Sequence, residues 1–366
     1  MTRPFREARI DVSAIAHNTE RMRRAAPTPH FMAVVKADGY GHGAVRAARA
    51  ALEAGADHLG VADVEEALEL RAAGIDAPVL AWLHDPLADL DAAAEAGIEL
   101  GVSSLAEVER VAAVGHRAVV HVKVDTGLSR NGAPAAQWGT IAEAVARAQA
   151  AGSLRLGGVF THLSNTTAEE DRAQLVAFEE FLDAARSAGL EPGLRHVAAS
   201  AAALDHPAAR YDMVRVGIAL YGIAPEHHLR GAVPWRPAME LSARVVNVKR
   251  VPAGSGVSYG YRYRTDRATT LALVPLGYAD GVPRHAVDGP VVIEGRRHRV
   301  VGRVAMDQCV VDVGDADVAV GDRAVLFGDP ATGAPAPEEW ADAAGTIGYE
   351  LVTRLGRRVT RTEARS

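Results

Sequence analysis

The chain has 366 residues, of which 48% are hydrophobic and 23% charged, a composition typical of folded globular proteins rather than disordered or fibrous ones. This length is enough for two domains. The 40 basic and 46 acidic residues give a net charge of -6, and no basic run suggests binding to nucleic acid or to a membrane surface.

Three further features bear on where the protein works. No apolar run reaches the 18 residues that a membrane span needs, and residues 1–11 alternate charges where a signal peptide is apolar. Cys309 is the single cysteine, so no disulfide can form within the chain. We therefore expect a cytoplasmic protein without a membrane or nucleic-acid partner, acting on a small molecule.

An opening helix is predicted over residues 14–25, with Ser13 or Asp11 as its N-cap, while the pairing of residues 1–10 stays open. Short apolar, β-branched runs then alternate with Ala-rich segments of helical period, such as 63–74, 105–115 and 168–189. The eight runs are 30–35, 58–62, 78–83, 98–103, 118–124, 156–162, 195–200 and 213–218. Eight βα units predict an α/β fold with an N-terminal (β/α)8 TIM-type barrel; a doubly wound sheet is the alternative.

Near residue 236 the pattern changes from helical segments to strand-like runs. These runs cover residues 239–251, 268–276, 291–306 and 324–328. They predict a C-terminal mostly-β domain, and the Pro- and Gly-containing loop 226–237 is the natural boundary. We therefore expect a barrel domain over residues 1–235 and a β domain over residues 236–366.

Reactive side chains stand where the predicted barrel strands end, which is where barrel enzymes place their active sites. Lys36 leaves an apolar strand for a Gly-rich turn, where desolvation would lower its pKa and suit it to Schiff-base chemistry. Arg130 follows the fifth strand, His162 ends the sixth, and Arg215 lies on the eighth. A ring of cationic groups at one barrel mouth predicts an anionic ligand.

The ends of the seventh and eighth strands suggest what that anion is. Ser200 ends the seventh run, and Gly217 and Ile218 end the eighth, the region in which barrels commonly hold a phosphate. A phosphate there, combined with a Schiff-base lysine on the first strand, points to pyridoxal 5'-phosphate.

These residues lie in blocks that resemble the alanine racemases, pyridoxal-phosphate enzymes of fold type III. The resemblance runs from residue 8 to residue 359 and includes the blocks AVVKADGYGHG, VKVDTGLSRNG, GVFTHLS, HVAAS, MVRVGIALYG, VSYGYRY, VPLGYADGVPR and GRVAMDQ. Because the blocks occur in the family's order across both predicted domains, the match is specific.

The resemblance implies interconversion of L- and D-alanine, supplying D-alanine for peptidoglycan. Lys36 would hold the cofactor and move a proton on one face of the substrate, and Tyr259 would do so on the other face. A phenol is a poor base at neutral pH unless cations lower its pKa, so we expect a positive group such as His162, held by Arg215, beside it.

The resemblance also implies a set of cofactor contacts. Arg215 would face the pyridine nitrogen, which then stays unprotonated because a guanidinium does not give up its proton. Arg130 would contact the cofactor's phenolic oxygen and the substrate carboxylate, and a carbamylated Lys123 would orient Arg130. The phosphate would be held by Tyr40, Ser200, Gly217, Ile218 and Tyr349.

Further residues are implied from the second domain. Met306 would bind the substrate carboxylate through its N–H beside Asp307, and Tyr278 and Arg284 would line the entrance. In the family, the residues that correspond to Tyr259 and Met306 come from the partner subunit, so a homodimer with shared sites is expected. The other histidines have no metal-site spacing, and no metal is expected.

The chain departs from the family pattern at several positions. These are Leu128, Ala199, Val216, Ala305 and the segment 163–167, which lacks an acidic residue often found there. The departures bear on rate and substrate breadth, so a serine or broad-specificity amino-acid racemase stays as an alternative. Arg215 argues against an amino-acid decarboxylase, and the second domain argues against a non-catalytic cofactor-binding module.

Overall fold

The computed structural model describes residues 4–114 and 117–364. Its described residues form two compact units. The barrel unit contains residues 19–39, 43–114 and 117–220, and the β unit contains residues 4–18, 40–42 and 221–364. The two units therefore do not divide at one point in the chain, and the boundary at residue 235 remains a prediction.

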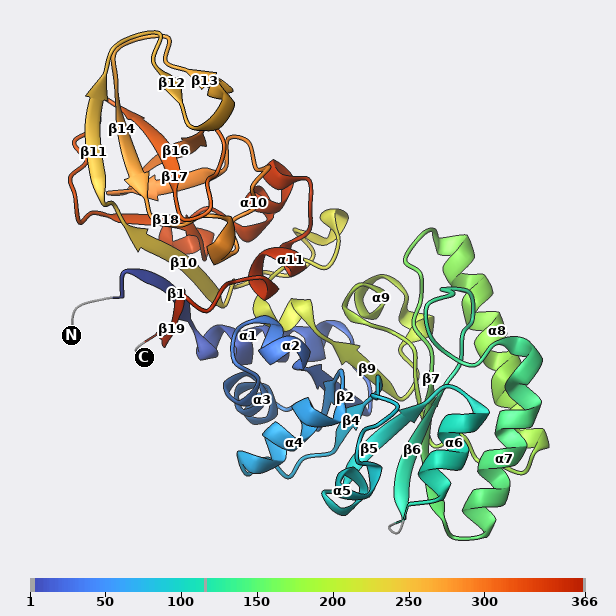
Figure 1. The fold of residues 1–366 in the computed structure, drawn as a ribbon. Helices are drawn as coiled ribbons and strands as arrows, with labels where there is room; N and C mark the ends of the chain where they lie inside the picture. Colours follow the sequence, from blue (N-terminus) through green and yellow to red (C-terminus); the bar gives the residue numbers. More distant parts are fainter. Residues whose placement is uncertain (1–3, 115–116, 365–366) are drawn as a thin grey trace. The chain divides into compact units, whose positions relative to one another are not determined.

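The barrel unit is built on eight parallel strands (Figure 1). In spatial order they are β8 (Leu194–His196), β7 (Leu154–Phe160), β6 (Ala118–Lys123), β5 (Ile98–Val102), β4 (Val79–Ala81), β3 (His58–Val61), β2 (His30–Val34) and β9 (Met213–Val216). A parallel bridge between Ala199 and Arg215 links the two ends of the sheet, which is thereby nearly closed. The predicted barrel is confirmed, and each strand begins within about two residues of its predicted start.

Helices cover the outside of these strands (Figure 1). They are α3 (Ala44–Glu53), α4 (Val64–Ala72), α5 (Leu90–Glu95), α6 (Leu105–Ala112), α7 (Trp138–Ala150), α8 (Ala168–Ser187) and α9 (Ser200–Asp205). The side chains of Asp63, Ser104 and Thr167 cap three of them by accepting a backbone N–H. Each of these three helices therefore begins directly after its capping residue.

The chain opens with a strand followed by a helix. β1 (Arg6–Ile10) precedes α1 (Val12–Ala25), and Oδ1 of Asp11 accepts from the N–H groups of Ser13 and Ala14. Of the two candidate N-caps, Asp11 therefore supplies the acceptor that the first turn needs.

The β unit is a nine-stranded sheet, so the predicted mostly-β domain is confirmed. Its order is β11 (Asn247–Val251), β14 (Thr269–Val274), β17 (Cys309–Gly314), β16 (Arg296–Val301), β15 (Pro290–Ile293), β18 (Arg323–Phe327), β10 (Met239–Arg244), β1 and β19 (Thr360–Glu363). The unit also holds the pair β12 (Gly256–Val257) and β13 (Tyr263–Arg264), with helices α10 (Pro337–Ala344) and α11 (Gly348–Thr353). β1 joins this sheet between β10 and β19, a pairing that the sequence left open.

None of the helices within residues 4–114 and 117–364 combines the length and the hydropathy that a membrane-spanning segment needs.

Candidate active site

The segment after β2 folds into a left-handed turn that begins at Lys36. It is α2 (Lys36–Tyr40), in which Ala37, Asp38 and Tyr40 have φ values of 53°, 52° and 51°. Each such L-residue costs about 1–2 kcal/mol relative to a right-handed helix. Glu66 helps to hold the turn, because its Oε1 accepts the N–H of Ala37 at 2.6 Å. Local strain of this kind, held by surrounding contacts, is typical of functional sites.

The surroundings of Lys36 favour the neutral amine. Burial lowers the pKa of Lys36, and the charges of Arg130 and Arg215 lower it further, whereas Glu66 acts in the opposite direction. The contact of Nζ with the Trp82 ring, 5.8 Å from its centre, likewise favours the charged form, and burial and the two arginines act against it. A lysine with a lowered pKa offers more free amine at neutral pH, as a nucleophile that binds a carbonyl covalently must.

Arg215 on β9 is held by backbone carbonyl groups. Its terminal nitrogens donate to the carbonyl oxygens of His196 at 2.6 Å, Thr161 at 2.7 Å and Val197 at 3.0 Å. Within the described part of the chain, its Nε–H has no acceptor, although Arg215 is only 5% exposed. Burial lowers the pKa of Arg215 to about 9, which still leaves it charged at neutral pH.

His162 lies just beyond β7, with its Nδ1 at 3.3 Å from Nη2 of Arg215. Burial and the charges of Arg215, Arg130 and Lys123 lower the pKa of His162 to about 3. The expectation of a positive charge on His162 is therefore wrong, because the neighbouring cations and the loss of water favour the neutral imidazole, while its place beside Tyr259 stays a prediction.

Lys123 and Arg130 extend this cationic group. Lys123 ends β6 and is 7% exposed; burial, Arg215 and Arg130 lower its pKa to about 8. Arg130 is exposed on the loop that follows. Oδ1 of Asp125 accepts the N–H groups of Gly127 and Ser129 at 3.0 and 3.1 Å, which shapes this loop.

The residues expected to bind phosphate are divided between the two units. In the barrel unit, Oγ of Ser200 accepts the N–H of Gly217 at 3.0 Å, next to Ile218. In the β unit, Tyr40 lies 6.3 Å from Tyr349, between ring centres, and burial raises the pKa of Tyr349.

The prediction that Ser200 ends the seventh barrel strand is wrong. β8 ends at His196, so Ser200 opens α9 instead of ending the strand. Ala199 at the N-cap supplies no side-chain hydrogen bond, which is the physical consequence of its departure from the family pattern.

Two of the expected site residues in the β unit are exposed: the Tyr259 side chain is 72% exposed and Met306 is 53% exposed. The segments that carry Tyr278 and Met306 are hydrogen-bonded to each other, because the carbonyl of Met306 accepts the N–H of Ala279 at 2.9 Å. Arg284 is exposed as well.

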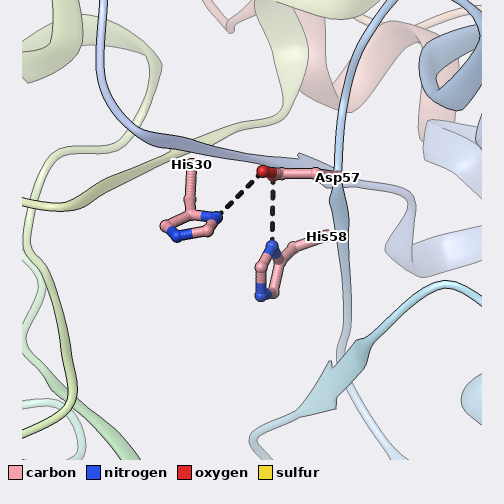
Figure 2. A group of neighbouring side chains, drawn as sticks. All are labelled: His30, Asp57 and His58. Atoms are coloured by element: carbon pink, nitrogen blue, oxygen red, sulfur yellow. Dashed lines mark hydrogen bonds and ion pairs between the residues drawn. The ribbon is translucent and has the colours of Figure 1, made fainter.

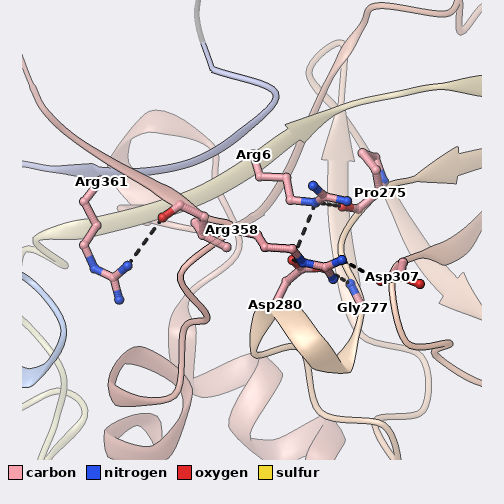
Figure 3. A network of polar contacts seen from close by, with 8 residues as sticks. Arg6, Pro275, Gly277, Asp280, Asp307, Arg358 and Arg361 are labelled. Carbon is pink, nitrogen blue, oxygen red and sulfur yellow. Dashed lines mark hydrogen bonds and ion pairs between the residues drawn. The ribbon is translucent and has the colours of Figure 1, made fainter.

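Arg358 holds the segments that carry Tyr278 and Met306, and the sequence offered no signal for this role. Figure 3 shows its guanidinium between two carboxylates: it binds both oxygens of the fully buried Asp280 at 3.0 and 3.1 Å, and Oδ1 of Asp307 at 2.6 Å. Oδ2 of Asp280 also accepts the N–H of Gly277 at 2.9 Å. A two-pronged contact of this kind fixes direction as well as distance.

At the opposite ends of the strands, His30, Asp57 and His58 form a cluster that the sequence spacing did not suggest (Figure 2). Their ligand atoms lie within 4.8 Å of one another, so the three residues could hold a metal ion. Both carboxylate oxygens are already engaged: Oδ2 lies 2.9 Å from Nδ1 of His30, and Oδ1 accepts the N–H of Phe31 and lies 3.1 Å from Nδ1 of His58. These hydrogen bonds account for the cluster as a brace between β2 and β3.

Two family models match the chain in sequence. The N-terminal domain of alanine racemase matches residues 10–225, and the C-terminal domain of alanine racemase matches residues 238–363. The chain belongs to the alanine racemase family.

Individual alanine racemases agree with this assignment along the whole chain. The alanine racemase of Thermobifida fusca is 54% identical over 366 residues, covering 98% of this chain and 97% of its own. The crystal structure from Streptomyces lavendulae superposes with a TM-score of 0.97 at 45% identity, covering 100% and 98% of the two chains. That of Bacillus anthracis, with bound L-Ala-P, has a TM-score of 0.90 at 33% identity, covering 100% and 96%. The broad-specificity alternative is not favoured by these alanine racemases.

Proposed function

We propose that the protein is a pyridoxal-phosphate-dependent alanine racemase that interconverts L- and D-alanine. The observation that supports this proposal most directly is that a desolvated Lys36 lies among the cations Arg130, Lys123 and Arg215. The residues fit the cofactor: the amine suits a covalent bond to an aldehyde, the cations suit its anionic groups, and the free Nε–H of Arg215 suits an unprotonated ring nitrogen. When bound, pyridoxal phosphate supplies an electron sink that makes the substrate Cα–H acidic.

Side chains of the protein itself would transfer the proton and bind the substrate carboxylate. Lys36 would hold the cofactor, and its free amine would take or return the Cα proton on one face of the substrate. Tyr259 does the same on the opposite face, so that a proton leaves on one side and arrives on the other. Arg130 binds the substrate carboxylate, and the N–H of Met306 assists it beside Asp307.

Lys123 becomes an anion if its neutral amine adds CO2, forming a carbamate and releasing one proton. Its pKa of about 8 leaves a useful fraction of the amine neutral at physiological pH. A carbamate would turn the repulsion between Lys123 and Arg130 into attraction and orient Arg130. The phosphate of the cofactor would lie against Tyr40, Ser200, Gly217, Ile218 and Tyr349, with Tyr278 and Arg284 at the entrance.

The active enzyme is proposed to be a homodimer in the cytoplasm, serving peptidoglycan synthesis. The exposure of Tyr259 and Met306 supports this assembly, because catalytic side chains so open to water in one chain become enclosed when a second chain covers them.

The experiment is incubation of the purified protein and pyridoxal phosphate with L-alanine in D2O. Optical rotation should decay to zero while deuterium appears at Cα, with neither keto acid nor amine as a main product. Persistent rotation with the cofactor bound would contradict the proposal. Parallel incubations with L-serine and L-lysine measure the substrate breadth.

A further inference from the structure

A buried row of polar side chains crosses the inside of the barrel and ends at Arg215. Oε2 of Glu99 on β5 lies 3.0 Å from Nε2 of His121 on β6. Nδ1 of His121 lies 2.9 Å from Nε2 of His196 on β8, whose Nδ1 lies 3.2 Å from Nη1 of Arg215. The two imidazoles are 1% and 0% exposed, so this row is closed to water along most of its length.

Glycines on the neighbouring strand leave room for the side chains of this row. β7 lies between β6 and β8, and it carries glycine where His121 crosses it. A Cβ on Gly158 would lie 2.6 Å from Nδ1 of His121, and one on Gly157 would lie 2.8 Å from its Nε2. Any side chain at either position would therefore displace the imidazole. The pairing of β6 with β7 also shifts register between Val120 and His121.

Only one arrangement of protons satisfies every contact in the row. Burial would raise the pKa of Glu99, but the hydrogen bond from His121 helps to outweigh burial and the pKa is lowered, so Glu99 is an anion that only accepts. Arg215 at the other end only donates. Burial, and then the charge of Arg215, holds the pKa of His196 well below its usual value, so His196 is neutral. Each imidazole must then carry its proton on Nε2 and accept on Nδ1.

We propose that Glu99 and His121 are positioning residues that act on Arg215 through His196. By accepting the Nε2–H of His121, Glu99 keeps the Nδ1 atoms of both imidazoles turned towards Arg215 as acceptors. This holds the guanidinium with its terminal nitrogens engaged and its Nε–H free. The inference rests on the proposed function, in which that Nε–H faces the cofactor ring nitrogen.

Loss of the acceptor at position 99 has a specific consequence. Without it, the buried Nε2–H of His121 is left unpaired, which favours moving the proton to Nδ1. His196 must then accept on Nε2 and carry its proton on Nδ1, which places a donor against the donor Nη1 of Arg215. A substitution that keeps an acceptor, Glu99→Gln, avoids this conflict, whereas Glu99→Leu creates it.

The test is nitrogen NMR of the cofactor-free full-length protein labelled with ¹⁵N-histidine. Wild type and Glu99→Gln should show His121 and His196 protonated on Nε2, and Glu99→Leu should show proton on Nδ1 of His196. Glu107→Leu is the matched control, because Glu107 is also a partly buried acceptor in the barrel unit, bonded to Ser103. An unchanged His196 tautomer in Glu99→Leu would overturn the proposal.

A second measurement uses the enzyme with its cofactor. Glu99→Leu should lower kcat about tenfold and raise the keto acid formed per racemisation, whereas Glu99→Gln should stay within about threefold of wild type. Equal values for both variants would also overturn the proposal. If Glu99→Leu does not fold, His121→Leu breaks the row at its next member, with the same expected outcomes. Failure of the wild type to racemise alanine would contradict the proposed function but not the proposed role of Glu99 and His121, because the NMR test needs no cofactor.

Discussion

Lys36, Lys123 and Lys249 are the only lysines among the 40 basic residues of the chain, and their surroundings differ. The first two lie in the barrel unit, where burial lowers the pKa of each, while Lys249 is exposed on β11. Arginine would keep its proton at these positions, so the chemistry of a free amine explains why lysine stands there.

Carbamylation of Lys123 is expected on this basis. The protein in ¹³C-bicarbonate should give a carbamate carbon signal that is lost in Lys123→Ala and kept in Lys249→Ala, the exposed control. Because CO2 adds only to the neutral amine and the pKa of Lys123 is about 8, the signal should grow as the pH rises from 6 to 8. A signal unchanged in Lys123→Ala would assign the modification elsewhere.

Tyr259→Phe should impair proton transfer on one face only. We expect deuterium exchange from one enantiomer of alanine to fall by about 10²–10⁴-fold while exchange from the other persists, with the cofactor still bound. Tyr261→Phe is the control, because Tyr261 is a nearby exposed tyrosine at 59% exposure. Normal exchange from both enantiomers in Tyr259→Phe would count against two proton carriers.

At the scale of elements, the ends of the barrel strands are held by side-chain acceptors. Glu66 binds the N–H groups of Ala37 and Ala62, at 2.6 and 2.8 Å, and so ties the left-handed turn after β2 to the end of β3. At the other ends of these two strands, Asp57 connects His30 and His58.

Glu66→Ala should destabilise the turn that presents Lys36. The exposed N–H of Ala37 and the partly buried N–H of Ala62 lose their acceptor, for which we expect a loss of about 0.5–1.5 kcal/mol in the free energy of unfolding. Formation of the lysine–cofactor absorption band should slow as well. Urea denaturation and absorbance measure the two effects, and Glu65→Ala, exposed on the same helix, should change stability by less than about 0.5 kcal/mol. Equal effects of both variants would refute the role of Glu66.

Asp57 should make stability depend on pH. Burial alone would raise its pKa, but hydrogen bonds from Phe31, His58 and His30 outweigh burial and lower the pKa. A lowered pKa in the folded state means that the stabilisation is present above the unfolded pKa of about 4 and is lost as the pH falls through the folded value. Because Asp57 is partly exposed, Asp57→Asn should cost about 0.5–1 kcal/mol at pH 6 and less at pH 3, measured by urea denaturation. A penalty independent of pH would contradict this account.

At the scale of the whole molecule, we expect each active site to combine residues of two chains. Lys36 lies in the barrel unit, and Tyr259 lies exposed in the β unit. If each site combines Lys36 of one chain with Tyr259 of another, the two residues can be supplied by different variants.

Mixing Lys36→Ala with Tyr259→Ala should therefore restore activity. Each variant alone is expected to be inactive, but a mixed dimer has one site with both residues intact. Random exchange of subunits gives about a quarter of the wild-type activity, because about half of the dimers are mixed and each has one good site. Sites built within one chain would give no recovery. Sedimentation measures the dimer independently.

Much of this architecture follows from the sequence alone. The alternation of apolar runs with helical segments predicted the barrel, because burial of a parallel sheet under helices requires that pattern at every strand. Lys36 directly follows the first of those runs and Arg215 lies within the eighth, both in distinctive blocks, so they could be singled out without coordinates.

The tertiary structure decided what depends on distant partners. The neutral state of His162 comes from cations and burial contributed by other strands, and the row from Glu99 through His121 to Arg215 joins four strands. The joining of β1 to the C-terminal sheet is of the same kind. Local pattern reports which residues are apolar and where a strand ends, but proton positions and charge states depend on neighbours that only folding brings within hydrogen-bond distance.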